Sequence, residues 1–229
     1  MKRVFAFVLS LIIIIALQCP IFASEDSKTA RRYYFKRNDK NQIALTFDDG
    51  PHPRYTYKIL NILKKYNIKA TFFIIGVNAK NYPDALKAIA DSGHEIGNHT
   101  FTHQYVKGKT RAQIIKDIKD CQETIYSICG KNTVLFRAPG GLIDEISVVS
   151  EDAFSGYDII YWSIDTMDWA HHSAQEIANN VINNIQSGDI ILMHDYIGRN
   201  SPTPEALEMI IPILLERGYE FVTVGELIN

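Results

Sequence analysis

Short apolar runs and longer amphipathic segments follow one another along most of the chain, a pattern typical of alternating strands and helices. The run from Thr71 to Ile75 is continuous, as expected of a parallel strand buried on both faces. Apolar residues from Thr56 to Tyr66 recur at helical spacing. Strands are predicted in the same way at 43–47, 71–75, 95–98, 134–136, 159–163, 190–193 and 221–224. Helices are predicted at 56–66, 84–91, 110–130, 147–154, 174–186 and 204–217.

The order of these elements predicts an α/β fold with a parallel sheet. Strand and helix alternate about seven times, and no clear hairpin turn joins adjacent strands. The roughly 190 residues available are few for a closed barrel of typical size. We therefore expect a distorted or incomplete (β/α) barrel of about seven parallel strands. A flat doubly wound sheet is the alternative, although no glycine-rich phosphate loop follows the first strand.

The N-terminal residues differ from the rest of the chain. Lys2 and Arg3 precede an apolar run from Val4 to Leu17, and Ala23 offers a small residue for cleavage, which is the layout of a secretory signal peptide. An uncleaved membrane anchor is the alternative, because Ile21 is large for a cleavage site and the run is short for a span. The predicted organisation is a signal peptide or anchor at 1–23, a linker at 24–40 that ends in a short edge strand at 33–35, and one domain at 41–229.

Composition narrows the class of protein. Hydrophobic residues make up 46% of the chain and charged residues 22%, as in globular proteins. The formal net charge of −2 gives no sign of the basic face that a nucleic-acid partner needs. Cys121 and Cys129 stand about 12 Å apart on one predicted helix. A disulfide spans no more than about 7 Å between Cα atoms, so both are expected to be thiols.

Polar side chains collect where the predicted strands end. They are Asp48, Asp49, His99, His103, Arg137, Asp165, Asp168, His194 and Asp195. The carboxyl ends of parallel strands meet at one rim, where the sites of α/β proteins lie. The sequence therefore predicts one site to which five strand ends contribute.

Two histidines and two carboxylates in this set predict a metal site. His99 and His103 are four positions apart, so a helical turn would place both imidazoles on one face. Such a pair is by itself a weak signal, because solvated or capping histidines are common. A carboxylate from another strand end completes the two-histidine, one-carboxylate set that leaves coordination positions open in catalytic zinc sites. Of Asp48 and Asp49, one can bind the metal while the other acts as a base.

Five segments resemble, in the same order, the signatures of the polysaccharide deacetylase family (carbohydrate esterase family 4, the NodB homology domain). They are Thr46–Gly50 (TFDDG), His99–His103 (HTFTH), Arg137–Gly140 (RAPG), Asp165–Trp169 (DTMDW) and Leu192–His194 (LMH). The similarity continues to residues 221–224, so 41–229 resembles a catalytic domain of this family. The family's distorted barrel agrees with the fold predicted from the pattern.

The resemblance implies the metal site and the base. Asp49, His99 and His103 would hold one divalent ion, with zinc expected. Asp48 would deprotonate the metal-bound water. Arg137 would orient Asp48 and balance its charge.

The resemblance also implies the acid and the substrate pocket. His194 would protonate the leaving amine, while Asp168 holds its other ring nitrogen. Trp169 and Leu192 would enclose the acetyl methyl group. In the Pro139–Gly140 segment, the N–H of Gly140 would help to stabilise the oxyanion. Many family members have an aromatic residue where Gly140 stands, so the departure bears on which sugar is bound.

The expected function is removal of N-acetyl groups from an amino-sugar polymer by a secreted or cell-surface monomer, free or tethered through residues 1–23. Peptidoglycan N-acetylglucosamine is the first candidate substrate, followed by chitooligosaccharides, and an acetylxylan esterase on the same scaffold is the second alternative. A carbohydrate-binding protein without catalysis would lack one of the matching residues, and none is missing. No Gly-x-Ser-x-Gly elbow is present for a serine hydrolase.

Other notable residues receive structural interpretations. Asp165 is expected to form a loop or capping bond, and Asp195 to be structural. His171 and His172 are expected on the rim. Trp162 is expected to belong to the core or to be half-buried.

Overall fold

The computed structural model describes residues 30–105, 108–141, 154, 156–196 and 200–229. The signal peptide or anchor predicted at 1–23 lies outside the described residues. So does the helix predicted at 147–154, apart from its last residue, Phe154. In the described part of the chain, no helix is both long enough and apolar enough to cross a membrane.

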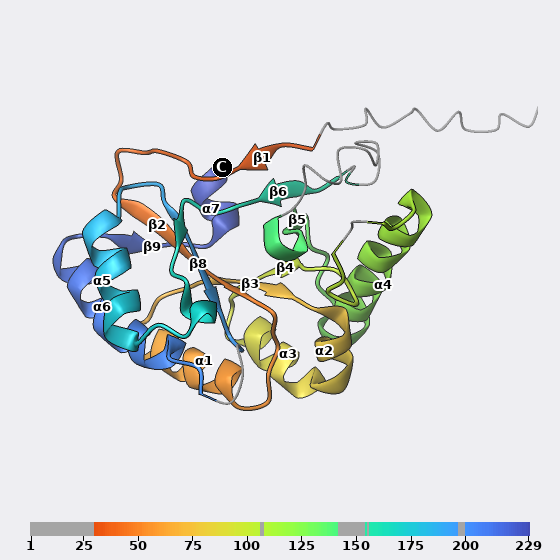
Figure 1. Cartoon of the computed structure of the whole chain (residues 1–229), viewed down its shortest axis with the longest axis horizontal. Coiled ribbons are helices and arrows are strands. Elements are labelled where there is room, and N and C mark those ends of the chain that lie inside the picture. The colour runs from red at the N-terminus through yellow and green to blue at the C-terminus, as the bar shows by residue number, and fades with distance from the viewer. Residues whose placement is uncertain (1–29, 106–107, 142–153, 155, 197–199) are drawn as a thin grey trace, which may run out of the picture.

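A parallel sheet forms the centre of the molecule (Figure 1). Its strands lie in the order β1 (Arg32–Tyr33), β6 (Asp158–Ile160), β5 (Leu135–Phe136), β4 (Glu95–Asn98), β3 (Thr71–Ile74), β2 (Gln42–Asp48), β8 (Ile190–His194) and β7 (Ile164–Asp165), and β9 (Glu220–Phe221) pairs with the start of β2. All of these strand pairs are parallel. The predicted fold class is confirmed, and the sheet formed by the described residues has nine strands in place of about seven.

The segment 159–163, predicted as one strand, is not one strand: residues 159 and 160 end β6, and 161–163 link β6 to β7. β6 is second in the strand order and β7 is last, yet only residues 161–163 link them. That link reaches at most about 14 Å, whereas six strand spacings in a flat sheet would separate β6 from β7 by about 29 Å. The sheet must therefore curl until its ends approach each other. This excludes the flat doubly wound alternative and gives an incomplete barrel.

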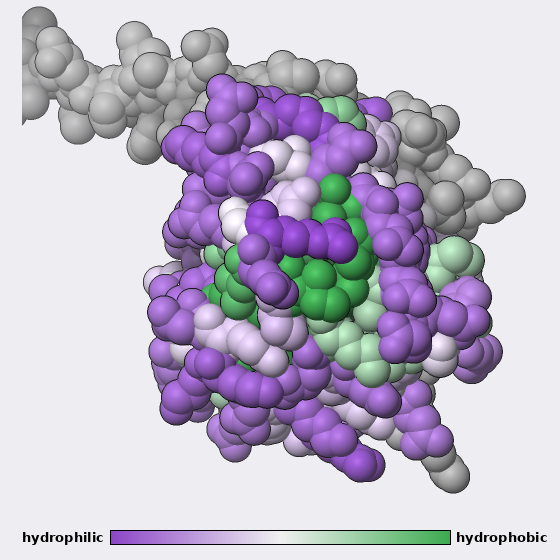
Figure 2. All heavy atoms as spheres, turned by 90° about the vertical axis from the view of Figure 1, so that its left-hand side faces the viewer, coloured by the Kyte–Doolittle hydropathy of each residue, from purple (hydrophilic) through white to green (hydrophobic). Residues whose placement is uncertain are grey.

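Helices cover the outside of the curled sheet. They are α1 (Tyr55–Lys65), α2 (Gly76–Asn81), α3 (Pro83–Asp91), α4 (Arg111–Cys129), α5 (Ala174–Asn184) and α6 (Thr203–Glu216). The ends predicted for α4 are confirmed, since Thr110 forms a capping box and Gly130 ends the helix at φ 68°. Figure 2 shows the side of the molecule that carries α5 and α6. Hydrophobic residues are visible at the centre of this side, and mostly polar residues surround them.

Successive side chains of β2 point to opposite faces of the sheet, one toward the helices outside and the other toward the inside of the barrel. Ile43, Leu45 and Phe47 belong to the large apolar cluster under the helices. Ala44 belongs to a smaller cluster that includes the short helix α7 (Val224–Ile228). α7 was not predicted, and only its first residue, Val224, lay in the strand predicted at 221–224, because five residues are too few to show a helical period. It covers the amino ends of β3 and β4 through hydrogen bonds to Thr71 and Glu95, so the site lies at the carboxyl ends.

Part of the predicted linker belongs to the sheet. The edge strand lies at Arg32–Tyr33 rather than 33–35, and Phe35 forms a bridge with Asp189. The backbone N–H of Lys36 also donates to the carbonyl of Gly188 (2.8 Å). A strand of two residues is too short to show an alternating pattern, so the sequence could not place it.

Candidate active site

Asp48 and Arg137 form a buried ion pair at the carboxyl ends of β2 and β5. Nη1 of Arg137 donates to Oδ1 of Asp48 and to Oγ1 of Thr46, each over 2.7 Å. The other guanidinium nitrogens donate to the carbonyls of Ile160 and Tyr161. Burial lowers the pKa of Arg137 and the Asp48 charge opposes this, and an arginine in such a fork of acceptors stays charged. Asp48 therefore has one oxygen fixed by Arg137 and the other, Oδ2, free to react.

Asp49, next to Asp48, turns away from the strand. Its φ of 73° is uncommon for a residue with a side chain, and the side-chain amide of Asn78 holds its carbonyl (2.7 Å). Oδ1 lies 3.1 Å from Nε2 of His103 and 3.5 Å from Nε2 of His99. Burial by itself raises the pKa of Asp49, but the two imidazoles hold it well below its ordinary range.

These three side chains have the chemistry of a metal site. One ligand atom from each of Asp49, His99 and His103 lies within 4.8 Å of the others. Nδ1 of His99 donates to the carbonyl of Arg137 (2.7 Å), because a carbonyl can only accept. In neutral His99 the lone pair is therefore on Nε2, which faces Asp49. Oδ1 of Asp49 is buried and accepts no hydrogen bond from any described residue, although both imidazoles are near. A divalent cation would satisfy all three lone pairs.

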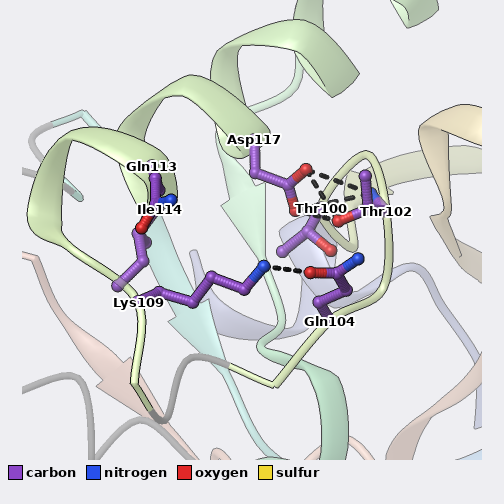
Figure 3. A pocket seen from close by; sticks show the side chains of 7 residues that line it. All are labelled: Thr100, Thr102, Gln104, Lys109, Gln113, Ile114 and Asp117. Atoms are coloured by element: carbon purple, nitrogen blue, oxygen red, sulfur yellow. Dashed lines mark hydrogen bonds between the residues drawn. The ribbon is translucent and has the colours of Figure 1, made fainter.

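The helical turn predicted for His99 and His103 is wrong. Residues 99–105 form a loop in which Thr100 (φ 68°) and His103 (φ 53°) are left-handed. The loop still brings the two rings to 5.0 Å between centroids. Spacing could not reveal this, because the conformation depends on contacts with α4. Asp117 of α4 accepts from the backbone N–H and the hydroxyl of Thr102 (Figure 3), and its carbonyl accepts from the N–H of Phe101.

His194 and Asp168 form a second pair beside the metal-binding residues. Nδ1 of His194 lies 2.7 Å from Oδ1 of Asp168, whose Oδ2 accepts from the backbone N–H of His194 and from Thr203. Asp168 is fully buried. Burial lowers the pKa of His194, but the hydrogen bond and charge of Asp168, with the charges of Asp48 and Asp49, raise it to about 9. This shift favours the imidazolium form of His194, in which Nε2 also carries a proton.

One cavity of about 370 Å³ joins both groups. It is lined by Asp48, Asp49, His99, His103, Tyr105, Gly140, Trp162, Asp165, Trp169, Leu192 and His194. Trp169, Leu192 and Gly140, predicted to contact the substrate, are therefore among the residues that line this cavity. Pro139 is buried beside Gly140 and is not among the lining residues.

Two lining residues, Tyr105 and Trp162, were not predicted as part of the site, and Asp165 was placed at the rim with a structural task. Tyr105 is 57% exposed and belongs to the loop after His103, where the sequence carries no signal. Trp162 was predicted to belong to the core or to be half-buried, and it is half-buried; its place in the cavity wall was missed because the break between β6 and β7 was not foreseen. Asp165 forms the expected loop bond, accepting from the N–H of Met167 (2.8 Å), and its Oδ1 also lies 3.3 Å from Nε1 of Trp169.

Proteins of known activity are similar to this chain in sequence and in fold. The model of the polysaccharide deacetylase family matches residues 35–158. A peptidoglycan-N-acetylglucosamine deacetylase of Bacillus cereus is 41% identical over 194 residues, which are 84% of this chain and 90% of that protein. The crystal structure of a peptidoglycan N-acetylglucosamine deacetylase in complex with 4-naphthalen-1-yl-N-oxidanyl-benzamide has a TM-score of 0.79 at 36% identity, and the match covers 86% and 92% of the two chains. A family 4 acetyl xylan esterase from Clostridium thermocellum, in complex with a cobalt ion, has a TM-score of 0.73 at 38% identity, covering 81% and 89%.

The fold and site define a metal-dependent hydrolase with an aspartate–arginine pair and an aspartate–histidine pair beside one metal site. The match covers more than half of the chain, and the chain belongs to the polysaccharide deacetylase family.

Proposed function

We propose that the protein removes N-acetyl groups from peptidoglycan N-acetylglucosamine outside the cytoplasm, as a monomer that binds one zinc ion. The observation that carries the proposal is that Asp48 and His194 line the same cavity as the three metal-binding residues. Amide hydrolysis needs a base for the attacking water and an acid for the leaving amine, and the cavity offers one of each. The peptidoglycan substrate and the extracytoplasmic location rest on the named activity of the relatives.

Asp49, His99 and His103 would hold the metal ion. When bound, the ion supplies Lewis-acid polarisation of the acetyl carbonyl and makes water more acidic. Two imidazoles and one carboxylate are typical ligands of catalytic zinc.

Asp48 would act as the base. Arg137 fixes Oδ1, so Oδ2 can take a proton from the attacking water without a change in side-chain position. Oδ2 lies 3.7 Å from Nε2 of His99, which places it beside the metal-binding atoms. The buried guanidinium of Arg137 lies beside the Asp48 carboxylate as its counter-ion.

His194 would act as the acid. Asp168 occupies Nδ1, so the proton to be donated is on Nε2. After the water attacks, this proton would pass to the nitrogen of the scissile amide, which leaves as the sugar amine. Trp169 and Leu192 would enclose the acetyl methyl group, and the N–H of Gly140 would help to stabilise the developing oxyanion.

The similarity to an acetyl xylan esterase supports a second candidate, removal of O-acetyl groups from xylan by the same residues. Acetate release from peptidoglycan, chitooligosaccharides and acetylxylan, measured side by side, tests the choice. We expect peptidoglycan to give the highest kcat/KM. A higher value on acetylxylan would favour the esterase, and no release from any substrate by the zinc-loaded protein would contradict both.

A further inference from the structure

Asp195 follows His194 at the end of β8 and is fully buried, yet the mechanism above gives it no task. Its backbone N–H donates to the carbonyl of Asp48 (3.1 Å), and its Oδ2 accepts from the hydroxyl of Thr56. Oδ1 is buried and has no hydrogen-bond partner among the described residues. An unpaired buried polar atom costs about 1–3 kcal/mol. Because the unpaired oxygen destabilises the fold, we looked for a contribution of Asp195 to function.

The carboxylate of Asp195 lies directly against the backbone of Gly50. A Cβ placed on Gly50 would be 2.1 Å and 2.3 Å from the two oxygens of Asp195, so only glycine fits there. Gly50 follows Asp49, the metal-binding residue with a φ of 73°. The carboxylate thus packs under the point where the chain turns away from β2.

Thr56 connects the same carboxylate to the far end of this loop. Thr56 lies in the first turn of α1, and its hydroxyl accepts from the backbone N–H of His52 (2.7 Å) while it donates to Asp195. The imidazole of His52 accepts from the N–H groups of Arg54 and Tyr55, which ties the loop to α1.

We propose that Asp195, through its contacts with Gly50 and Thr56, is a positioning residue that holds the loop after β2 in the shape that directs Asp48 and Asp49 toward the metal. A side chain that orients metal ligands in this way typically changes metal affinity or activity by about 10- to 100-fold when it is removed. The proposal concerns the protein's own loop and does not depend on which polymer is the substrate.

The test compares zinc affinity and kinetics of the full-length protein and its variants. Thr56→Val keeps the volume of the side chain and removes the hydroxyl, and Asp195→Ala removes the carboxylate. We expect zinc affinity, from competition with a chromophoric chelator, to fall about tenfold or more in both, and kcat to fall with little change in KM. Asp195→Asn keeps an acceptor for Thr56 and is expected to lie between Asp195→Ala and wild type.

Thr71→Val is the matched control. Thr71 donates to the partly buried carboxylate of Glu95 (2.7 Å) and accepts from the N–H of Val224 (2.9 Å). This is the same arrangement as at Thr56, but at the amino ends of the strands, which α7 covers. Thr71→Val should lower thermal stability and leave zinc affinity and kcat unchanged. Zinc affinity and kcat within twofold of wild type in Thr56→Val, or an equal loss in Thr71→Val, would overturn the proposal. Zinc binding without acetate release by the wild type would contradict the proposed function alone.

Discussion

Two neighbouring aspartates have different environments, and we propose different tasks for them. Asp48 is the last residue of β2, points into the barrel and is paired with Arg137. Asp49 has already left the strand and faces His99 and His103. The structure therefore predicts that a single change of side-chain chemistry will have a different effect at each position.

Asp48→Asn should retain zinc and lose turnover by about 10²- to 10⁴-fold, because the base is removed while the ligands stay. It should also lower the melting temperature, since the buried charge of Arg137 loses its counter-ion. Asp49→Asn should weaken zinc binding itself. Metal content after gel filtration and acetate release at saturating zinc measure the two effects. Equal zinc content in both variants would show that the division of roles is wrong.

The pH profile should report the pair formed by His194 and Asp168. Asp168 raises the pKa of His194, and a general acid works only below its pKa, so activity is lost as pH rises through that value. Asp168→Asn removes the charge and should move the alkaline limb of kcat/KM to lower pH by about one to two units, equivalent to the roughly 1.5–3 kcal/mol of a charged hydrogen bond. Asp195→Asn is the comparison variant, because Asp195 does not bond His194. If the alkaline limb moved further in Asp195→Asn than in Asp168→Asn, the assignment of His194 as the acid would be wrong.

At the scale of elements, each functional side chain is placed by a strand end, and a neighbouring element fixes the loop that follows. The inward positions of β2 bring Thr46 and Asp48 to Arg137. The loop with His99 and His103 has no regular structure of its own, and α4 holds it through Asp117 (Figure 3). A helix on the outside of the barrel thus contributes to the geometry of the metal site.

Asp117→Ala should therefore lower zinc affinity by about tenfold, although Asp117 does not touch the metal-binding atoms. Helix α4 should persist, because alanine has the highest helix propensity. Asp120→Ala on the same helix removes only an exposed ion pair with Lys116 and serves as the control. Competition titrations with zinc compare the two variants. Equal affinity in both would show that the loop keeps its shape without Asp117.

At the scale of the whole molecule, the proposed metal ion would connect Asp49, directly after β2, with the loop after β4. Zinc should therefore stabilise the fold, by about 2.7 kcal/mol at a free concentration 100 times its Kd. Chelation should abolish activity and lower the melting temperature, and zinc should restore both. In Asp49→Asn, zinc should raise the melting temperature much less than in wild type, as measured by differential scanning calorimetry. Full activity after complete removal of metal would contradict the mechanism.

The sequence by itself determined the fold class and most of the elements, and it proposed candidate residues for the site. Alternating strand and helix patterns are local, and they place Asp48, Arg137 and His194 at strand ends whatever the barrel's final shape. The motif order alone also pointed to Asp49, His99 and His103, which the structure brings within 4.8 Å.

Only the tertiary structure decided how these pieces close around the cavity. Contacts between residues far apart in the chain decide three features. They are the break between β6 and β7, the position of α7 over the amino ends of the strands, and the loop conformation at His103. Trp162 and Tyr105 enter the cavity wall for the same reason. Local periodicity contains no information on such contacts, because a short strand, a five-residue helix and an irregular loop are each stabilised by what packs against them.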